Sequence, residues 1–149
     1  MNCTDVMTPA PVCCEPGNTI AEAARLMSSG NVGALPVVQD RRRWEVIGMI
    51  TDRDIAIRVV AEGRDPNETT VDAVMTREPI ACAEDDLYQQ ALQMMADRQV
   101  RRLPVTERST GRLVGIISQA DIATRVAQPS TTGALVEAIS EPAIPASSR

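Results

Sequence analysis

The chain has 149 residues, of which 44% are hydrophobic and 23% charged, and its formal net charge is -5. This length suits one compact domain or two small repeats that share a core, and the composition is ordinary for a globular protein. The negative charge argues against a nucleic-acid partner. The N-terminus lacks the basic and apolar regions of a secretory signal, and no apolar run is long enough to cross a bilayer, so we expect a cytoplasmic protein with no membrane partner.

The cysteines are Cys3, Cys13, Cys14 and Cys82. They show no C-x-x-C spacing, and the chain has no histidine to complete a zinc site, so we predict no metal centre. Cys13 and Cys14 are adjacent and would face opposite sides of a strand. Buried or half-buried free thiols are the expected state of these residues.

The first half of the chain carries signals for a complete set of elements. An apolar piece at residues 12–14 predicts a short strand, and a helix is predicted from Thr19, where Glu22 completes a capping box. The β-branched runs "ALPVV" and "WEVIGMI", joined by the polar "DRRR", predict a hairpin. A second helix is expected from Thr51 to near Gly63.

The second half repeats this order of elements. We expect a strand at residues 80–82, a helix from about 84 to 98, strands at 102–106 and 113–117, and a helix from Ser118. The stretch "GRDPNETT" joins the halves. A last helical stretch, residues 130–139, lies outside the repeat.

Two copies of one unit account for most of the chain. The letters "VMT" at residues 6–8 and "LPV" at 35–37 both return after 68 residues, and "GMITDRDIA" at 48–56 returns as "GIISQADIA" after 67. This repetition indicates an internal duplication. We predict an α/β (α+β) fold of two β-α-β-β-α repeats with a pseudo-two-fold axis and a short C-terminal helix. The expected boundaries are 1–68 (core about 4–63) and 69–128 for the repeats, and 129–149 for a helical extension and tail.

Each copy places a hydroxyl three residues before an aspartate: Thr51 before Asp54, and Ser118 before Asp121. One interpretation is a helix cap, in which the hydroxyl accepts a hydrogen bond from a backbone N–H. The other is half of a ligand site, where free helix amides and the hydroxyl meet a phosphate and the aspartate accepts hydrogen bonds from a ribose. The two interpretations are compatible. No nucleophile–base pair and no glycine-rich phosphate loop is visible, so we predict no catalytic residue and no enzyme.

The element order, with "LPVV" before the hairpin and "GMITDRDI" after it, resembles the cystathionine-β-synthase-type (CBS) domain. Two such units in tandem resemble a CBS pair, or Bateman module, and the likeness covers roughly residues 4–127. The chain is similar to small stand-alone bacterial CBS proteins of the hypoxic-response type. The resemblance implies a regulatory homodimer that binds an adenosine-containing ligand (AMP, ADP, ATP or S-adenosylmethionine) in clefts between its repeats. It implies no other cofactor.

The resemblance also implies two groups of ligand-binding residues. In each, the aspartate of one repeat grips the ribose, while the opening segment and the "LPV" edge of the other repeat hold the adenine. The first group is Thr51, Asp54, Thr76, Pro79, Ile80, Ala81, Val100, Arg101 and Arg102. The second group is Ser118, Asp121, Ile116, Thr8, Val12, Cys13, Val32 and Gly33.

The two predicted sites differ in charge. Arg101 and Arg102 would lie beside the Asp54 site, and Arg53 is inside its motif, so we expect phosphate there rather than at the Asp121 site. A solvated strand edge explains these arginines equally well. Two other functions stay open. One is a CBS-fold structural or interaction module that binds a protein partner and no nucleotide; the other is a small enzyme.

Overall fold

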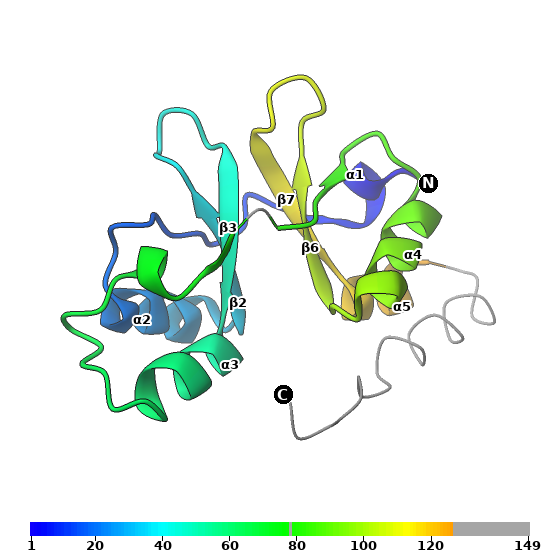
Figure 1. Ribbon diagram of the computed structural model, residues 1–149. Helices are drawn as coiled ribbons and strands as arrows, with labels where there is room; N and C mark the ends of the chain where they lie inside the picture. The colour runs from blue at the N-terminus through cyan, green and yellow to red at the C-terminus, as the bar shows by residue number, and fades with distance from the viewer. Residues whose placement is uncertain (78, 127–149) are drawn as a thin grey trace. The chain divides into compact units, whose positions relative to one another are not determined.

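The computed structural model describes residues 1–77 and 79–126, which fall into two compact units (Figure 1). Unit 1 contains Met1–Pro9, Ile80–Arg108 and the chain from Val114, and unit 2 contains Ala10–Pro79 and Ser109–Leu113. The opening segment of the chain therefore belongs with the second repeat. The α+β fold and its two repeats are as predicted, whereas the helix expected at residues 130–139 lies outside the described residues.

Unit 2 holds a three-stranded sheet of order β2-β3-β4. Helices α2 and α3 pack against each other beside β2 and β3 (Figure 1). The capping box predicted for α2 is present, because Glu22 N–H donates to the Thr19 hydroxyl at 3.1 Å and Thr19 N–H donates to the Glu22 carboxylate at 3.2 Å. The elements of unit 2 are α2 (Ile20–Gly30), β2 (Ala34–Val38), β3 (Val46–Thr51), α3 (Asp52–Ile55), the π-helix η1 (Ala56–Val60), the 3-10 helix η2 (Val71–Ala73) and β4 (Thr76–Arg77).

Unit 1 holds the strands β1, β7, β6 and β5, in that order across one sheet. Strand β1 pairs antiparallel with β7, and β5 pairs parallel with β6. Helix α1 packs against both α4 and α5, and α4 packs against β6 (Figure 1). The elements of unit 1 are α1 (Cys3–Val6), β1 (Thr8–Pro9), β5 (Cys82–Ala83), α4 (Tyr88–Arg98), β6 (Arg102–Thr106), β7 (Leu113–Ser118) and α5 (Gln119–Arg125).

Each unit has an aliphatic core of its own. In unit 2 the core gathers Ile20, Leu35 and Ile50, and in unit 1 it gathers Leu92 and Ile117, all of them fully buried. Burying such side chains is the main source of stability for a sheet covered by helices. All four cysteines are buried and free, as predicted. Among the described residues, no helix is both long and apolar enough to span a membrane.

Two predicted elements need correction. The strand expected at residues 12–14 is only an isolated parallel bridge between Cys14 and Val37. The helix expected from about residue 84 begins at Tyr88, because the Asp86 carboxylate accepts the Ala83 N–H at 2.9 Å and holds the acidic stretch in a turn. The sequence analysis also missed the short elements α1, η2, β1 and β4, which are too brief to show a periodic pattern.

Candidate ligand-binding site

Thr51 and Asp54 form a capping box at the start of α3. The Asp54 N–H donates to the Thr51 hydroxyl at 3.1 Å, and the Thr51 N–H donates to Oδ2 of Asp54 at 2.9 Å. Ser118 and Asp121 form the same box at the start of α5, with distances of 3.0 Å and 3.2 Å. The helix-cap interpretation of the repeated motif is therefore confirmed.

The cap uses only one oxygen of each aspartate. Within the described residues, Oδ1 of Asp54 and Oδ1 of Asp121 accept no hydrogen bond and form no ion pair. Both side chains are half-buried rather than enclosed. Each carboxylate is thus fixed in orientation by the helix start and keeps a second oxygen for another donor.

The amides of the first turn of α3 are already occupied. Asp52 N–H donates to the Gly33 carbonyl at 2.9 Å, Arg53 N–H to the Asp52 carboxylate at 2.8 Å, and Asp54 N–H to the Thr51 hydroxyl. The prediction that free amides at this helix start meet a phosphate is wrong for α3, because a side chain of the protein fills the anion's place.

Strand register corrects part of the predicted grouping. Strands β2 and β3 pair antiparallel with Ala34 opposite Thr51, so Val32 and Gly33 adjoin the Asp54 motif of their own repeat. In unit 1, Gln119 N–H donates to the Arg101 carbonyl at 3.0 Å, which puts Val100, Arg101 and Arg102 beside the Asp121 motif. A hairpin necessarily puts the start of its first strand beside the end of its second.

The two threonines of the "VMT" segments lie in the units where they were predicted to act. Thr76 pairs with Met49 on β3, and Thr8 pairs with Ile116 on β7. Pro79 lies in unit 2 with Asp54, whereas Ile80 and Ala81 belong to unit 1. Val12 and Cys13 belong to unit 2, not to the unit of Asp121.

A glycine allows each "VMT" segment to cross its strand. A Cβ added to Gly48 would lie 2.9 Å from the Thr76 carbonyl oxygen, and one added to Gly115 would lie 2.9 Å from that of Thr8. The methionine preceding each threonine is also in the way, since Met75 and Met7 approach the same glycines. These glycines, which the sequence analysis did not single out, permit the close backbone approach that sets both threonines.

Two arginines also went unpredicted. Arg58, four residues after Asp54, donates to the Val74 carbonyl at 2.9 Å. Arg125, four residues after Asp121, donates to the carbonyls of Val6 at 3.1 Å and Met7 at 2.7 Å. Each ties its motif helix to the "VMT" segment, and their 67-residue separation, the same as that of the aspartates, is the signal that could have revealed them.

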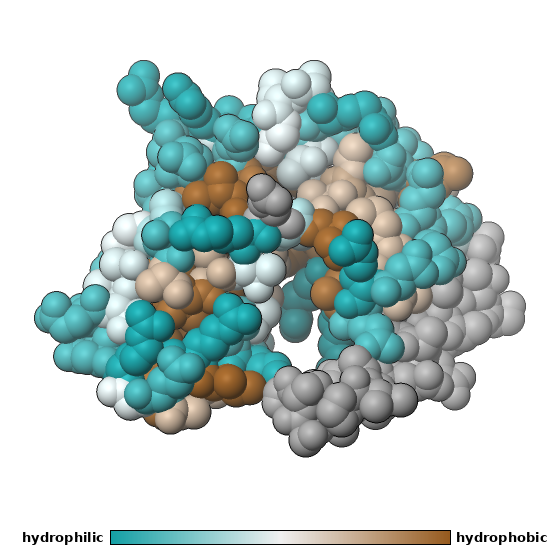
Figure 2. All heavy atoms as spheres, in the orientation of Figure 1, coloured by the Kyte–Doolittle hydropathy of each residue, from teal (hydrophilic) through white to brown (hydrophobic). Residues whose placement is uncertain are grey.

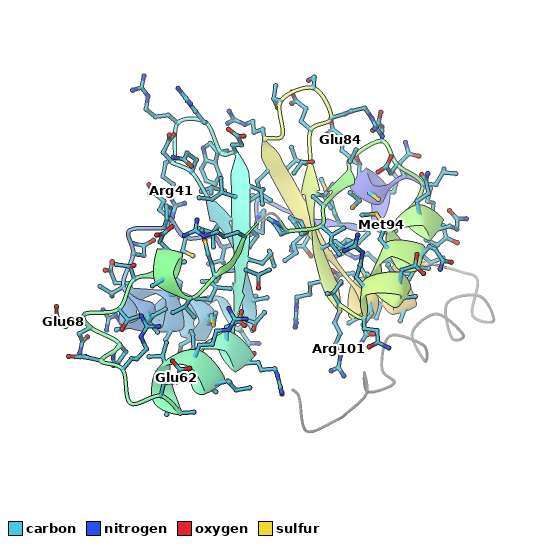
Figure 3. The ribbon with its side chains drawn as sticks, in the orientation of Figure 1. Arg41, Glu62, Glu68, Glu84, Met94 and Arg101 are labelled. Atoms are coloured by element: carbon cyan, nitrogen blue, oxygen red, sulfur yellow. The ribbon has the colours of Figure 1, made fainter. Side chains whose placement is uncertain are left out.

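The two motifs differ in charge, and in the opposite sense to the prediction. The Asp54 motif adds the carboxylate of Asp52, which occupies space next to Gly33 that a Cβ there would invade at 2.9 Å. At the corresponding positions, the Asp121 motif has the neutral Gln119 and the cationic Arg101. Arg101 is exposed at the start of β6 (Figure 3). The Asp121 motif therefore has the more favourable surroundings for an anion.

Gln119 also carries an unsatisfied polar atom. Its Oε1 is buried and, among the described residues, has no hydrogen-bond partner. Buried side-chain oxygens are normally paired, so this one, beside Ser118, stands ready to accept an N–H or O–H donor.

The repeats match a known family. The model of the CBS domain matches residues 3–61 and again residues 71–128, and the chain belongs to this family as a CBS pair. It is 40% identical over 136 residues to the CBS domain-containing protein YhcV of Bacillus subtilis, covering 91% of this chain and 93% of the relative. It is also 40% identical over 120 residues to hypoxic response protein 1 of Mycobacterium tuberculosis, covering 80% of each chain.

Solved structures of CBS pairs share the fold. The crystal structure of hypoxic response protein I, with two coordinated zinc ions, superposes with a TM-score of 0.76 at 36% identity, covering 85% of this chain and 99% of that one. Within the described residues of the present chain, no group of three histidine, cysteine, aspartate or glutamate side chains is placed to hold a metal. The CBS pair of protein MJ0100, in complex with 5′-methylthioadenosine and S-adenosyl-L-methionine, superposes with a TM-score of 0.73 at 28% identity, covering 83% and 94%.

Proposed function

We propose that this CBS pair binds an adenosine-containing ligand at each of its two motifs and acts as a ligand-responsive regulatory module rather than an enzyme. The observation that carries the proposal is the pair of aspartates held by capping boxes, each with one carboxylate oxygen left for a donor. A ribose offers two adjacent hydroxyl donors to such a carboxylate. The MJ0100 pair, which holds two adenosine compounds, supports this class of ligand.

Several neighbours of the aspartates fit the rest of an adenosine. Thr76 and Thr8 are exposed at the strands next to the two motifs, and Val32 and Gly33 adjoin Thr51. Small and apolar side chains with nearby backbone groups suit a flat base with a polar edge. The remaining predicted contacts, Pro79, Ile80, Ala81, Val12 and Cys13, are part of the same proposal.

The two sites are proposed to prefer different ligands. Arg101 and Arg102 adjoin the Asp121 motif, and Oε1 of Gln119 can accept a hydrogen bond from the ligand. A phosphate-bearing nucleotide therefore suits the Asp121 motif. The Asp54 motif, with the additional Asp52 carboxylate, suits a neutral or cationic adenosine compound such as S-adenosylmethionine. Binding at either motif would favour the conformation that the ligand fits better.

The test is calorimetric titration of the full chain with AMP, ADP, ATP and S-adenosylmethionine. Asp54→Ala and Asp121→Ala remove one ribose contact each, and Asp97→Ala, on the exposed face of α4, is the matched control. We expect Asp121→Ala to abolish the binding of phosphate-bearing nucleotides and Asp97→Ala to change nothing. Arg101→Ala should weaken ATP more than S-adenosylmethionine.

A negative result has a clear meaning. Absence of heat with all four compounds, from folded protein freed of nucleotide, would reject the proposal and favour an interaction module with a protein partner. Turnover of a nucleotide in the same samples would instead favour an enzyme. Circular dichroism of each variant separates loss of binding from loss of fold.

A further inference from the structure

Cys3 and Cys82 come from distant parts of the sequence and meet in the core of unit 1. Cys3 lies in α1 with 0% of its surface exposed, and Cys82 opens β5 with 1% exposed. Their side chains are hydrogen-bonded to each other and belong to one apolar cluster. The fold therefore holds two free thiols in contact.

Backbone hydrogen bonds fix the register of this contact. Cys3 N–H donates to the Asp86 carbonyl at 2.8 Å, and Thr4 donates to the Glu84 carbonyl from both its N–H, at 3.1 Å, and its hydroxyl, at 2.7 Å. Figure 3 shows Glu84 beside α1, just beyond the end of β5. The single turn of α1 is thus held along the segment that follows Cys82.

Unit 2 contains the matched site without the second thiol. Cys14 is the counterpart of Cys82, since it lies 68 residues earlier and donates to the Pro36 carbonyl at 3.9 Å, as Cys82 does to that of Pro104 at 3.8 Å. The counterpart of Cys3 is Val71, which is fully buried in the cluster that contains Cys14. A valine satisfies the packing in unit 2, so packing alone does not require the thiol of Cys3.

The two thiols have different acidities. The hydrogen bond with Cys82 lowers the pKa of Cys3 despite its burial and the nearby charges of Asp86 and Asp85, and it raises the pKa of Cys82. Cys14 has no such partner, and burial raises its pKa to about 12. A thiolate is the attacking species in thiol oxidation, so Cys3 is the thiol that reacts first.

We propose that Cys3 and Cys82 form an intramolecular disulfide when the chain is oxidised by a peroxide. The Cys3 thiolate attacks one peroxide oxygen, the O–O bond breaks, and a sulfenic acid and water result after proton uptake. The Cys82 sulfur then attacks the Cys3 sulfur, the S–O bond breaks, and a second water leaves. The two thiols lose two electrons and two protons, and the peroxide is reduced to two waters.

The disulfide would bond the opening segment covalently to β5. That segment runs on through Met7, which accepts a hydrogen bond from Arg125, to Thr8, which pairs with Ile116 on β7. The bond would close a long loop, and such loops give a disulfide its largest effect on stability. The inference does not depend on ligand binding.

The experiment oxidises the reduced full-length chain with hydrogen peroxide, alkylates the remaining thiols and maps the peptides by mass spectrometry without reductant. Cleavage before aspartates places Cys3 in residues 1–4, Cys13 and Cys14 in 5–39, and Cys82 in 72–84. We expect residues 1–4 linked to 72–84. Oxidation should raise the thermal midpoint by several degrees, and dithiothreitol should reverse the rise.

Two variants make the result specific. Cys3→Val copies the residue found at the matched position of unit 2 and should abolish both the link and the rise in midpoint, whereas Cys14→Val should abolish neither. Cys82→Ala is a second test if Cys3→Val folds poorly. Unlinked peptides 1–4 and 72–84, a bond between Cys13 and Cys14, or a midpoint shift that persists in Cys3→Val would each overturn the proposal.

Discussion

Arg125 contributes to unit 1 through its guanidinium group rather than through its charge at the surface. Its guanidinium donates to the carbonyls of Val6 and Met7, and among the described residues it takes part in no salt bridge. Removing the donor leaves two carbonyls of the opening segment without this partner. Hydrogen bonds from charged donors contribute more than neutral ones, so this residue should matter for stability.

We predict that Arg125→Met destabilises the chain by about 1 to 3 kcal/mol, because the variant keeps the aliphatic stem and loses the donor. Urea denaturation followed by circular dichroism measures the change. Arg101→Met is the matched control, since Arg101 is exposed and its change should stay within about 0.5 kcal/mol. Equal effects of the two substitutions would mean that the bond to the opening segment contributes nothing.

At the scale of elements, the crossing of β7 by the opening segment depends on a glycine. A Cβ on Gly115 would meet the Thr8 carbonyl oxygen at 2.9 Å and would also collide with Met7. The crossing of β3 by the second "VMT" segment has the same requirement at Gly48. Neither glycine has a positive φ, so the constraint is space rather than backbone conformation.

We predict that Gly115→Ala and Gly48→Ala each destabilise the chain by about 1 to 3 kcal/mol, because backbone has to move to admit the methyl group. Gly17→Ala is the control, as nothing lies within 4 Å of a Cβ there. Differential scanning calorimetry gives the midpoints. If Gly115→Ala unfolds at the temperature of Gly17→Ala, the close approach of Thr8 is not a constraint.

The sequence predicted the longer elements and missed the short ones for a physical reason. Helix α2 and the β2–β3 hairpin carry a capping box and β-branched runs, both of which act within a few residues. Elements such as η2 and β4 form only because the chain crosses a neighbouring strand, which local preference does not encode. The start of α4 was misplaced because Asp86 closes a turn instead of entering the helix.

The candidate site was predictable in its parts and not in its assembly. The duplicated hydroxyl and aspartate gave the two capping boxes, and the repeat alone pointed to both. The assignment of Arg101 and Arg102 to the Asp54 motif failed because it ignored hairpin register, which keeps a strand start beside the motif of its own repeat. Arg58 and Arg125 act on backbone carbonyls, for which the sequence of the partner gives no signal.

At the scale of the whole molecule, neither unit is a contiguous stretch of sequence. The opening residues supply Cys3 and Val6, both 0% exposed, to the core of unit 1, while the first repeat proper forms unit 2. The segment between the "VMT" of the second repeat and β5 passes from unit 2 to unit 1. Each "VMT" segment therefore pairs with the sheet of the other copy's hairpin, which explains why the threonines fell in the predicted units although the arginines did not.

The proposed homodimer needs an apolar surface, and η1 offers one. Ala56, Ile57, Val60 and Ala61 are exposed, with Ile57 at 42% and Val60 at 69%. Figure 2 shows apolar side chains at the surface over the α3 region, at the lower left, among hydrophilic neighbours. Small and β-branched side chains on one helical stretch allow a second copy of the helix to approach closely.

We predict that Val60→Glu converts the dimer to a monomer, because a charge at the centre of an apolar contact loses its hydration without gaining a partner. Sedimentation equilibrium at several concentrations measures the association constant, which should fall at least about tenfold, equivalent to about 1.4 kcal/mol. Glu68→Gln, in the exposed loop before η2, is the control and should leave it unchanged. A dimer that persists in both Val60→Glu and Ile57→Glu would place the contact elsewhere. A wild-type chain that is monomeric at every concentration would reject the homodimer itself, and the exposed valine would then be a solitary surface residue of the kind that soluble proteins commonly carry.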